Sequence, residues 1–253
     1  MTLLFIILAT FLISLISFAG AITLFLKEKI LEKILLILIA FSAGSLLGDA
    51  FFHLIPEAIE ESGIENEKSI LSIFIYLTFG FCVFYVLESF IHWHHHHGTR
   101  HSEIKPFSYL ILFSDGVHNI IDGLIIAVSF VVSLPLGIAS AIAVMSHEIP
   151  QEIGDFSLLI YGGFKKKKAL FFNFLSGIFA VLGGILGFLI SGKIENSIVF
   201  LLSFAAGSFI YIACSDIIPE IKNKKEGLLK SLLYFLFFLA GLAMMILIKF
   251  LFH

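Results

Sequence analysis

The sequence predicts an all-α membrane protein whose eight transmembrane helices are arranged as three, two and three. Three features lead to this prediction: the composition, a series of long apolar runs, and a repeated segment. Of the 253 residues, 59% are hydrophobic and 14% are charged, whereas soluble domains are about half apolar and a quarter charged. A mean hydropathy of +1.05 exceeds what a soluble protein of this size can hide, because such a protein needs a polar surface.

Eight runs of about twenty apolar residues, the length that crosses a hydrocarbon core, divide the chain. The first run has no charged residues before its apolar stretch and stays apolar until Lys27, so we interpret it as a retained span and not as a signal peptide. The spans leave almost nothing for a soluble part, which predicts a single transmembrane domain over residues 1–253. We expect spans at about 2–26, 34–57, 69–92, 107–133, 137–161, 168–191, 197–219 and 228–251.

Basic residues gather in the loops that follow the odd-numbered spans. These loops hold 13 Lys and Arg residues, against three on the other face. Because basic loops stay cytoplasmic, we expect both termini to be non-cytosolic, in a plasma or inner membrane. The acidic loop after span two, with Glu57, Glu60 and Glu61, is either a solvated loop or an electrostatic funnel for cations. The sequence contains no basic surface of the kind that would indicate a nucleic-acid partner. Its two cysteines lie within apolar runs and do not support a disulfide framework.

A segment of span two recurs in span seven. Residues 41–45 (FSAGS) match 204–208 (FAAGS), and 53–57 (HLIPE) match 216–220 (DIIPE), both at an offset of 163. The same offset relates span one to span six and span three to span eight, which leaves spans four and five unmatched. The loop charges give spans two and seven opposite directions, as in the inverted repeats of transporters. Chance similarity between two apolar helices with Gly and Pro is the alternative.

Spans four and five carry most of the ionisable residues that fall inside the predicted membrane. Such groups are costly in lipid, and they normally face a bundle interior or a watery path. In span four the spacing i, i+3, i+4, i+7 places Asp115, His118, Asn119 and Asp122 on one helix face. Span five adds His147, Glu148, Gln151, Glu152 and Asp155.

This mixture of imidazole, carboxylate and amide groups is typical of sites for divalent first-row transition metals. Calcium would prefer oxygen ligands alone, and soft copper would prefer thiolates. We therefore expect a divalent metal as transported substrate, with zinc first and iron, manganese or cadmium as further candidates, and no catalytic cofactor. A purely structural hydrogen-bond network between the helices is the alternative, but two histidines and five acids exceed what such a network requires.

The motif His118-Asn-Ile-Ile-Asp122-Gly, followed by His147-Glu-Ile-Pro-Gln151-Glu, resembles the paired signatures of the ZIP family of divalent metal transporters, in particular its histidine-rich branch. The likeness covers the whole chain. It implies transport of a divalent metal ion, most of all zinc, toward the cytosol, through an alternating-access site on spans four and five.

The resemblance also implies which side chains hold the metal. One position would be lined by His118, Asp122, His147 and Gln151, and a second by Asn119, Asp122, Glu148 and Gln151. This branch usually has His where the chain has Gln151, and other members have Glu. A neutral amide is a weaker ligand, so either binding is looser or the preference moves away from zinc.

Further polar residues flank the site. We expect Asp49, His53 and Asp216, together with Asp115, Glu152 and Asp155, to line an access path; hydrogen bonding at helix ends is the alternative for Asp49, His53 and Asp216. Residues 92–106 are predicted to form a cytosolic loop with six histidines in its first ten residues, which either captures metal or is an inert solvated loop. Its histidines are His92, His94, His95, His96, His97 and His101.

Two rival functions share some of these features. The sequence His147-Glu-Ile-Pro-Gln151 looks like the H-E-x-x-H motif of an intramembrane zinc metallohydrolase, but Gln replaces the second His and a proline interrupts the turn between them. We therefore predict that the protein is not an enzyme. A metal-selective channel of the same fold is the other alternative. Expected partners are divalent metal ions and membrane lipid, with a homodimer as a further candidate.

Overall fold

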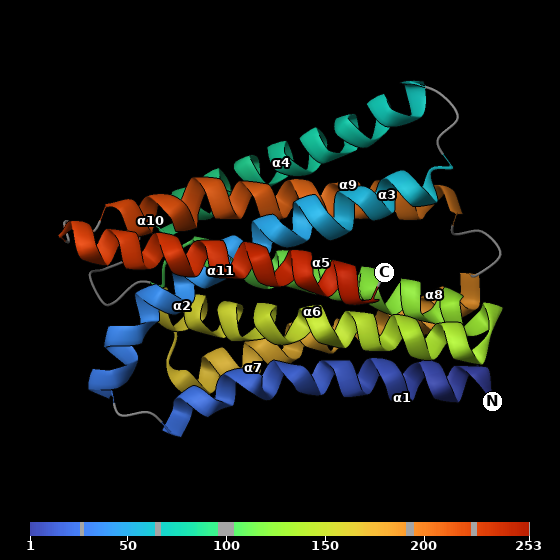
Figure 1. Ribbon diagram of the computed structural model, residues 1–253, viewed down its shortest axis with the longest axis horizontal. Helices are drawn as coiled ribbons and strands as arrows, with labels where there is room; N and C mark the ends of the chain where they lie inside the picture. The colour runs from blue at the N-terminus through green and yellow to red at the C-terminus, as the bar shows by residue number, and fades with distance from the viewer. Residues whose placement is uncertain (26–27, 64–66, 96–103, 191–194, 224–226, 253) are drawn as a thin grey trace.

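Figure 1 shows the computed structural model, which describes residues 1–25, 28–63, 67–95, 104–190, 195–223 and 227–252. Every regular element within these ranges is a helix. In chain order they are α1 (Thr2–Ser14), the 3₁₀ helix η1 (Leu15–Phe25), α2 (Glu28–Asp49), the π-helix η2 (Ala50–Leu54), α3 (Ile55–Glu61), α4 (Glu67–His95), α5 (Phe107–Val132), α6 (Leu134–Tyr161), α7 (Lys166–Gly177), α8 (Phe179–Ile190), α9 (Glu195–Tyr211), the π-helix η3 (Ile212–Ile217), α10 (Ile218–Lys222) and α11 (Leu228–Phe252).

Among the described residues, seven continuous helical stretches are long and apolar enough to cross a membrane. They coincide with the predicted spans one to four and six to eight. The predicted fifth span is the 28-residue helix α6, which is long enough but less apolar. Its lower apolarity has a clear cause, because α6 carries His147, Glu148, Glu152 and Asp155.

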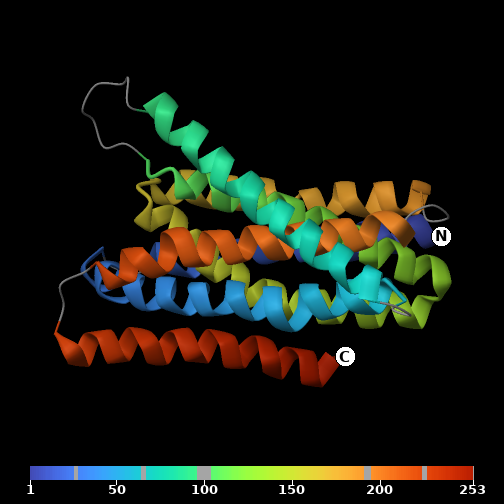
Figure 2. The ribbon, with the colours of Figure 1, turned by 90° about the horizontal axis from the view of Figure 1, so that it is seen from above.

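Most of the helices run along one common axis, and the N- and C-termini lie toward the same end of the bundle (Figure 1). In Figure 2, α11 follows one edge and α4 crosses the bundle at an angle. The apolar windows of α4 and α11 are only 17% and 22% buried, against 61% for α5 and α9. The polar helix α5 is therefore central, and the most apolar faces point outward, as expected where lipid is the solvent.

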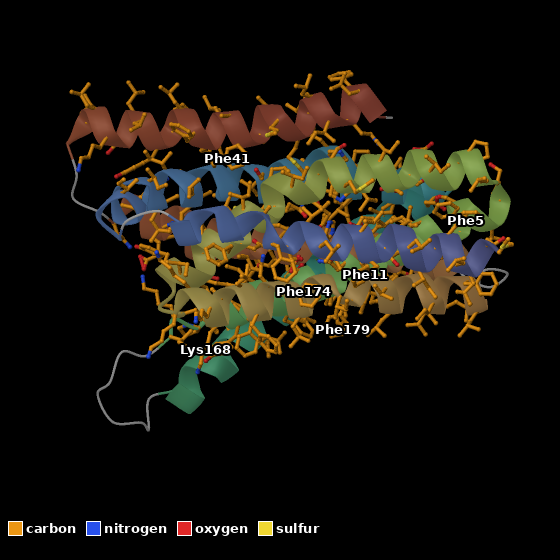
Figure 3. All side chains as sticks on the ribbon, turned by 90° about the horizontal axis from the view of Figure 1, so that it is seen from below. Phe5, Phe11, Phe41, Lys168, Phe174 and Phe179 are labelled. Atoms are coloured by element: carbon orange, nitrogen blue, oxygen red, sulfur yellow. The ribbon has the colours of Figure 1, made fainter. Side chains whose placement is uncertain are left out.

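Aromatic and aliphatic side chains are exposed on the outer surface of the bundle. Figure 3 shows Phe5, Phe11, Phe174 and Phe179 along the helices of one flank, and Lys168 at the end opposite the termini. Phe171 of α7 and Leu189 of α8 are 59% and 70% exposed. Exposed aromatic and aliphatic groups along the helices and a lysine at one end match the pattern of a lipid-facing surface.

Two features recur at the offset of 163 found in the sequence. The π-helix η2 ends at Leu54 and η3 ends at Ile217, 163 positions later, and their first residues, Ala50 and Ile212, are 162 positions apart. Both repeated segments therefore contain a π-helix at nearly the same place. A Cβ atom on Gly44 would lie 2.0 Å from the Phe238 oxygen of α11, and one on the equivalent Gly207 would lie 2.0 Å from the Leu77 oxygen of α4. Only glycine allows either approach, so α2 packs on α11 as α9 packs on α4.

One span changes helix type along its length, and one boundary differs from the boundary expected. The first span continues from α1 into the 3₁₀ helix η1 after Ser14. Helix α4 extends to His95, three residues beyond the predicted start of the histidine-rich loop, because the first helix-breaking residue of this stretch is Gly98. His92, His94 and His95 are therefore on a helix, while His96, His97 and His101 lie outside the described residues.

Candidate metal centre

The antiparallel helices α5 and α6 bring four of the predicted site residues together. His118, Asp122, His147 and Glu148 each offer a ligand atom within 4.8 Å of the others. Asp122 Oδ2 lies 3.6 Å from His118 Nε2 and 3.2 Å from His147 Nε2. Glu148 Oε1 lies 3.4 Å and 3.8 Å from the same two nitrogens. All four residues are buried, so two imidazoles and two carboxylates converge on one point inside the bundle.

Span two adds Asp49 and His53 to the edge of this group. Asp49 Oδ2 lies 4.0 Å from His118 Nε2, and Asp49 Oδ1 lies 3.6 Å from His53 Nδ1. Asp49 ends α2, and His53 lies within the π-helix η2. A π-turn rotates the residues that follow it relative to a continuous α-helix, and such turns are common at functional sites. The sequence analysis above does not predict this turn. The recurrence of the surrounding segment in span seven is the feature of the sequence that could have marked its place.

A cavity of about 60 Å³ leads away from the imidazoles. It runs toward the end of the bundle where both termini lie. With distance from the imidazoles, the residue numbers on its wall rise along α2, α3 and α5 and fall along the antiparallel α6. Six ionisable side chains and one serine are on its wall, a polar lining that suits a cation better than an apolar one would. The lining residues are Asp49, His53, Leu54, Glu57, His118, Asp122, Ile125, Ser140, Val144 and His147.

The carboxylates of this region accept few hydrogen bonds. Apart from the imidazole contacts given above, the oxygens of Glu148 and Asp49 accept no hydrogen bond, and Glu148 and Asp49 are fully buried. An ionised carboxylate in such surroundings costs several kcal/mol unless an opposite charge or donors compensate it. A bound cation would supply that compensation, so the donor set fits a divalent metal substrate.

The two predicted amide ligands are also buried in this region. The Asn119 amide nitrogen donates to the Asp115 carbonyl oxygen at 3.1 Å and to Asp115 Oδ1 at 2.9 Å. Its own oxygen Oδ1 then has no donor, which leaves it available as a ligand. Gln151 is 3% exposed, and its amide nitrogen has no acceptor.

Further along α5 and α6, Asp115, Glu148 and Glu152 form a group of carboxylates within 4.8 Å of one another. Glu152 accepts a hydrogen bond from Ser17 Oγ at 2.6 Å and another from the Asn173 amide. Ser17 in η1 and Asn173 in α7 were not predicted as site residues. Their signal in the sequence is weak, because single Ser and Asn residues are common in membrane helices.

The remaining predicted residues either lie apart from this centre or have side chains that the structure does not describe. Asp216 is half-buried in η3 and does not line the cavity. His92, His94 and His95 are placed by their helix alone, because the structure does not describe their side chains.

Comparison with known proteins gives the family. The model of the ZIP zinc transporter family matches residues 2–108 and 92–249, two overlapping segments that together cover nearly the whole chain. The chain belongs to the ZIP family. The protein is therefore an integral membrane protein with several membrane passes.

Similar ZIP relatives come from several animals. The chain is 31% identical to the metal cation symporter ZIP14 of Xenopus tropicalis, over 85% of the chain and 62% of that protein. It is 31% identical to the zinc transporter SLC39A7 of Mus musculus, over 86% and 63%, and 30% identical to the zinc transporter zipt-7.1 of Caenorhabditis briggsae, over 84% and 70%. The chain thus spans somewhat less than two thirds of the first two relatives.

Proposed function

We propose that this protein carries a divalent transition-metal ion, zinc first of all, across a membrane through the centre formed by His118, Asp122, His147 and Glu148. The observation that carries the proposal is the convergence of these four buried ligand groups within 4.8 Å. The cavity that leads from them toward one end of the bundle and the names of the relatives support it.

We further propose that the chain is one transmembrane unit of eight helices in a 3+2+3 inverted repeat. The matched π-helices and the matched glycines Gly44 and Gly207 support this arrangement. Spans four and five then hold the metal between the two repeats, and movement of one bundle against another opens the site alternately to each side. By the loop charges, the termini are non-cytosolic. The direction of transport, toward the cytosol, follows from the resemblance to the ZIP family.

The ligand set explains why zinc is placed first. Zinc is borderline soft and binds imidazole nitrogen well, whereas manganese depends more on oxygen. Asp122, like Glu148, contacts both imidazoles and is therefore an anion shared by the two histidines. Gln151 contributes a neutral oxygen at most, which weakens the site and allows the ion to leave, as a transport site requires.

Uptake into proteoliposomes tests this function directly. Zinc uptake by the wild type should saturate with concentration, and Asp122→Ala should reduce it to background, because the variant loses the anion that offsets dehydration of the cation. Glu60→Ala, which removes an exposed acid of α3, is the matched control and should transport normally. Near wild-type uptake by Asp122→Ala, with equal protein in the vesicles, would exclude this site.

The two rival functions give different results in the same preparation. A channel would show flux that rises with concentration without saturating. A metallohydrolase would cleave a peptide substrate in a zinc-dependent way, which we do not expect because Gln151 replaces the second His of that motif.

A further inference from the structure

A large cavity lies between the start of α11 and the helices α2 and α10, apart from the histidine centre. Its volume is about 400 Å³, several times that of the cavity beside the imidazoles. This volume falls within the range of about 300–1,000 Å³ that is typical of small-molecule sites. One residue of α2, three of α10 and four of α11 form its wall. We call it the α11 cavity.

Close packing between α2 and α11 closes this cavity at its inner end. A Cβ atom on Gly44 would lie 2.0 Å from the Phe238 oxygen, and one on Gly241 would lie 2.2 Å from the Phe41 oxygen. The backbones of the two helices therefore touch at this level, and Phe238 also lines the cavity. The cavity thus lies between this contact and the start of α11, toward the end of the bundle opposite the termini (Figure 1).

Polar and apolar residues of the wall are separated along the bundle axis. Lys222 is the last residue of α10, and Ser231 lies in the first turn of α11, so both are near the end of the bundle. Phe235 and Phe238 follow Ser231 on the same face of α11, about one and two turns further in. Ile218 lies about one turn inward of Lys222. The α11 cavity therefore has a polar mouth and an apolar depth.

The helix that forms most of this wall also presents apolar side chains to its surroundings. Leu232 and Phe235 of α11 are 52% and 54% exposed, as expected of a surface in contact with lipid. Water would find few hydrogen-bond partners in the apolar depth of the cavity. An acyl chain of a neighbouring lipid is the apolar group that can reach it, and its polar headgroup would then lie at the mouth.

Lys222 gives the mouth of the cavity a positive charge. Glu220, two residues earlier, binds the Lys105 ammonium, and Lys222 makes no ion pair with any residue that the structure describes. Three more lysines follow it in the sequence: Lys224, Lys225 and Lys230. Basic pockets between membrane helices bind the headgroups of anionic lipids. The charge of the mouth therefore complements a lipid phosphate.

We propose that the α11 cavity binds an anionic phospholipid, with an acyl chain in its apolar depth and the phosphate at Lys222 and Ser231. The ammonium supplies the opposite charge, and the hydroxyl donates a hydrogen bond to a phosphate oxygen. A zwitterionic lipid has the same chain and phosphate, but it also carries a cationic group that Lys222 repels. The basic loops predict that this lipid belongs to the cytosolic leaflet. The site is separate from the metal centre, so lipid binding does not depend on the proposed transport.

Binding of phosphatidylglycerol to the purified full chain tests the headgroup contact. Radiolabelled phosphatidylglycerol, or phosphatidylcholine with the same acyl chains, is added in detergent micelles, and the lipid retained by immobilised protein is measured. The wild type should bind phosphatidylglycerol more tightly. Lys222→Ala should weaken this binding about fivefold, the contribution of one lysine near an anionic headgroup, and leave phosphatidylcholine binding nearly unchanged. Lys168→Ala, which removes a lysine of α7 at the same end of the bundle, is the matched control and should bind as the wild type does.

Ser231→Phe tests the position of the acyl chain, because the larger side chain would occupy the mouth of the cavity. It should weaken the binding of both lipids by about tenfold, the scale of overpacking in a filled site. Leu236→Phe adds the same ring to an exposed position of α11 outside the cavity wall and should change neither affinity. Gel filtration shows whether the variants are folded, and Ser231→Leu provides a smaller substitution if Ser231→Phe is not.

Several results would overturn the inference. These are equal affinity of the wild type for the two lipids, unchanged lipid binding in the folded Ser231 variant, or an equal loss in Lys168→Ala, which would indicate a general surface charge. Competition by free glycerol phosphate would indicate a phosphate site without an acyl chain. A changed oligomeric state of Ser231→Phe, with lipid binding intact, would assign the cavity to a second copy of the chain.

Discussion

Glu57 and Glu220 occupy equivalent places in the two repeated Pro-Glu segments, 163 residues apart, but their surroundings differ. Glu57 lines the cavity that leads to the imidazoles. Glu220 of α10 binds the Lys105 ammonium and accepts a hydrogen bond from the Tyr161 hydroxyl at 3.2 Å. One segment therefore borders a path into the protein, and the other is tied to its neighbours.

The contact around Glu220 joins three parts of the chain. Lys105 precedes α5, and Tyr161 ends α6. The Lys105 ammonium also lies 4.2 Å from the centre of the Tyr161 ring. The backbone nitrogen of Lys105 donates to the Gly162 backbone oxygen at 2.8 Å. Neither Lys105 nor Tyr161 belongs to the repeat, so residues around spans four and five make the two ends unequal. Equivalent segments thus acquire different roles because different residues pack against them.

The largest expected effect concerns access to the site from the two ends. In a background with Cys82 and Cys214 changed to Ala, we expect Ser140→Cys on the cavity wall to react with a small cationic thiol reagent on the order of 100-fold faster than Ser114→Cys. Ser114 is buried and bonded to Ser208 Oγ at 2.7 Å, so its reaction needs a local opening of about 3 kcal/mol. Detergent-solubilised protein exposes both ends to the reagent, and equal rates would contradict the difference between the ends.

A smaller effect should follow when the tied end is released. Lys105→Ala removes the ammonium that contacts both Glu220 and the Tyr161 ring. The side chains of Lys105 and Glu220 are 39% and 30% exposed, so solvent screens the pair and its loss is worth about 1 kcal/mol at most. The reaction of Ser114→Cys should therefore speed up by about fivefold or less.

Lys222→Ala is the control for this release, because it removes a positive charge from the same short helix, α10. It should leave the rate of Ser114→Cys unchanged. If both lysine variants raised the rate equally, the effect would be one of net charge at this end and not of the contact with Glu220.

The smallest expected effect is at the open end. Glu57→Gln should raise the half-saturation concentration for zinc uptake about twofold to threefold at low ionic strength, because it removes an anion that attracts cations into the cavity. The effect should shrink at 0.15 M salt, where the screening length is about 8 Å. Glu60→Gln on the exposed face of α3 should change uptake less, and an equal effect of both variants would indicate a general surface field.

The sequence by itself determined the class of protein and most of the helices. A long apolar run in lipid must form a helix, because only a helix satisfies its own backbone hydrogen bonds there, so run lengths predict spans. The site helices were predictable for the opposite reason. Polar residues such as Asp122 and His147 are costly in a membrane unless they converge, and their helical spacing showed which faces would meet.

Only the tertiary structure decided which atoms meet. Glu148, assigned by resemblance to a second metal position, lies against both imidazoles, and Asp49 reaches His118 from another helix. Ser17 and Asn173 hold Glu152 although they are 156 residues apart in the chain. The spacing of residues along one helix determines which of them share a face. It does not determine how the neighbouring helix is rotated about its axis or shifted along it. Rotation and shift depend on packing contacts between helices, such as those at Gly44 and Gly207, which no local pattern encodes.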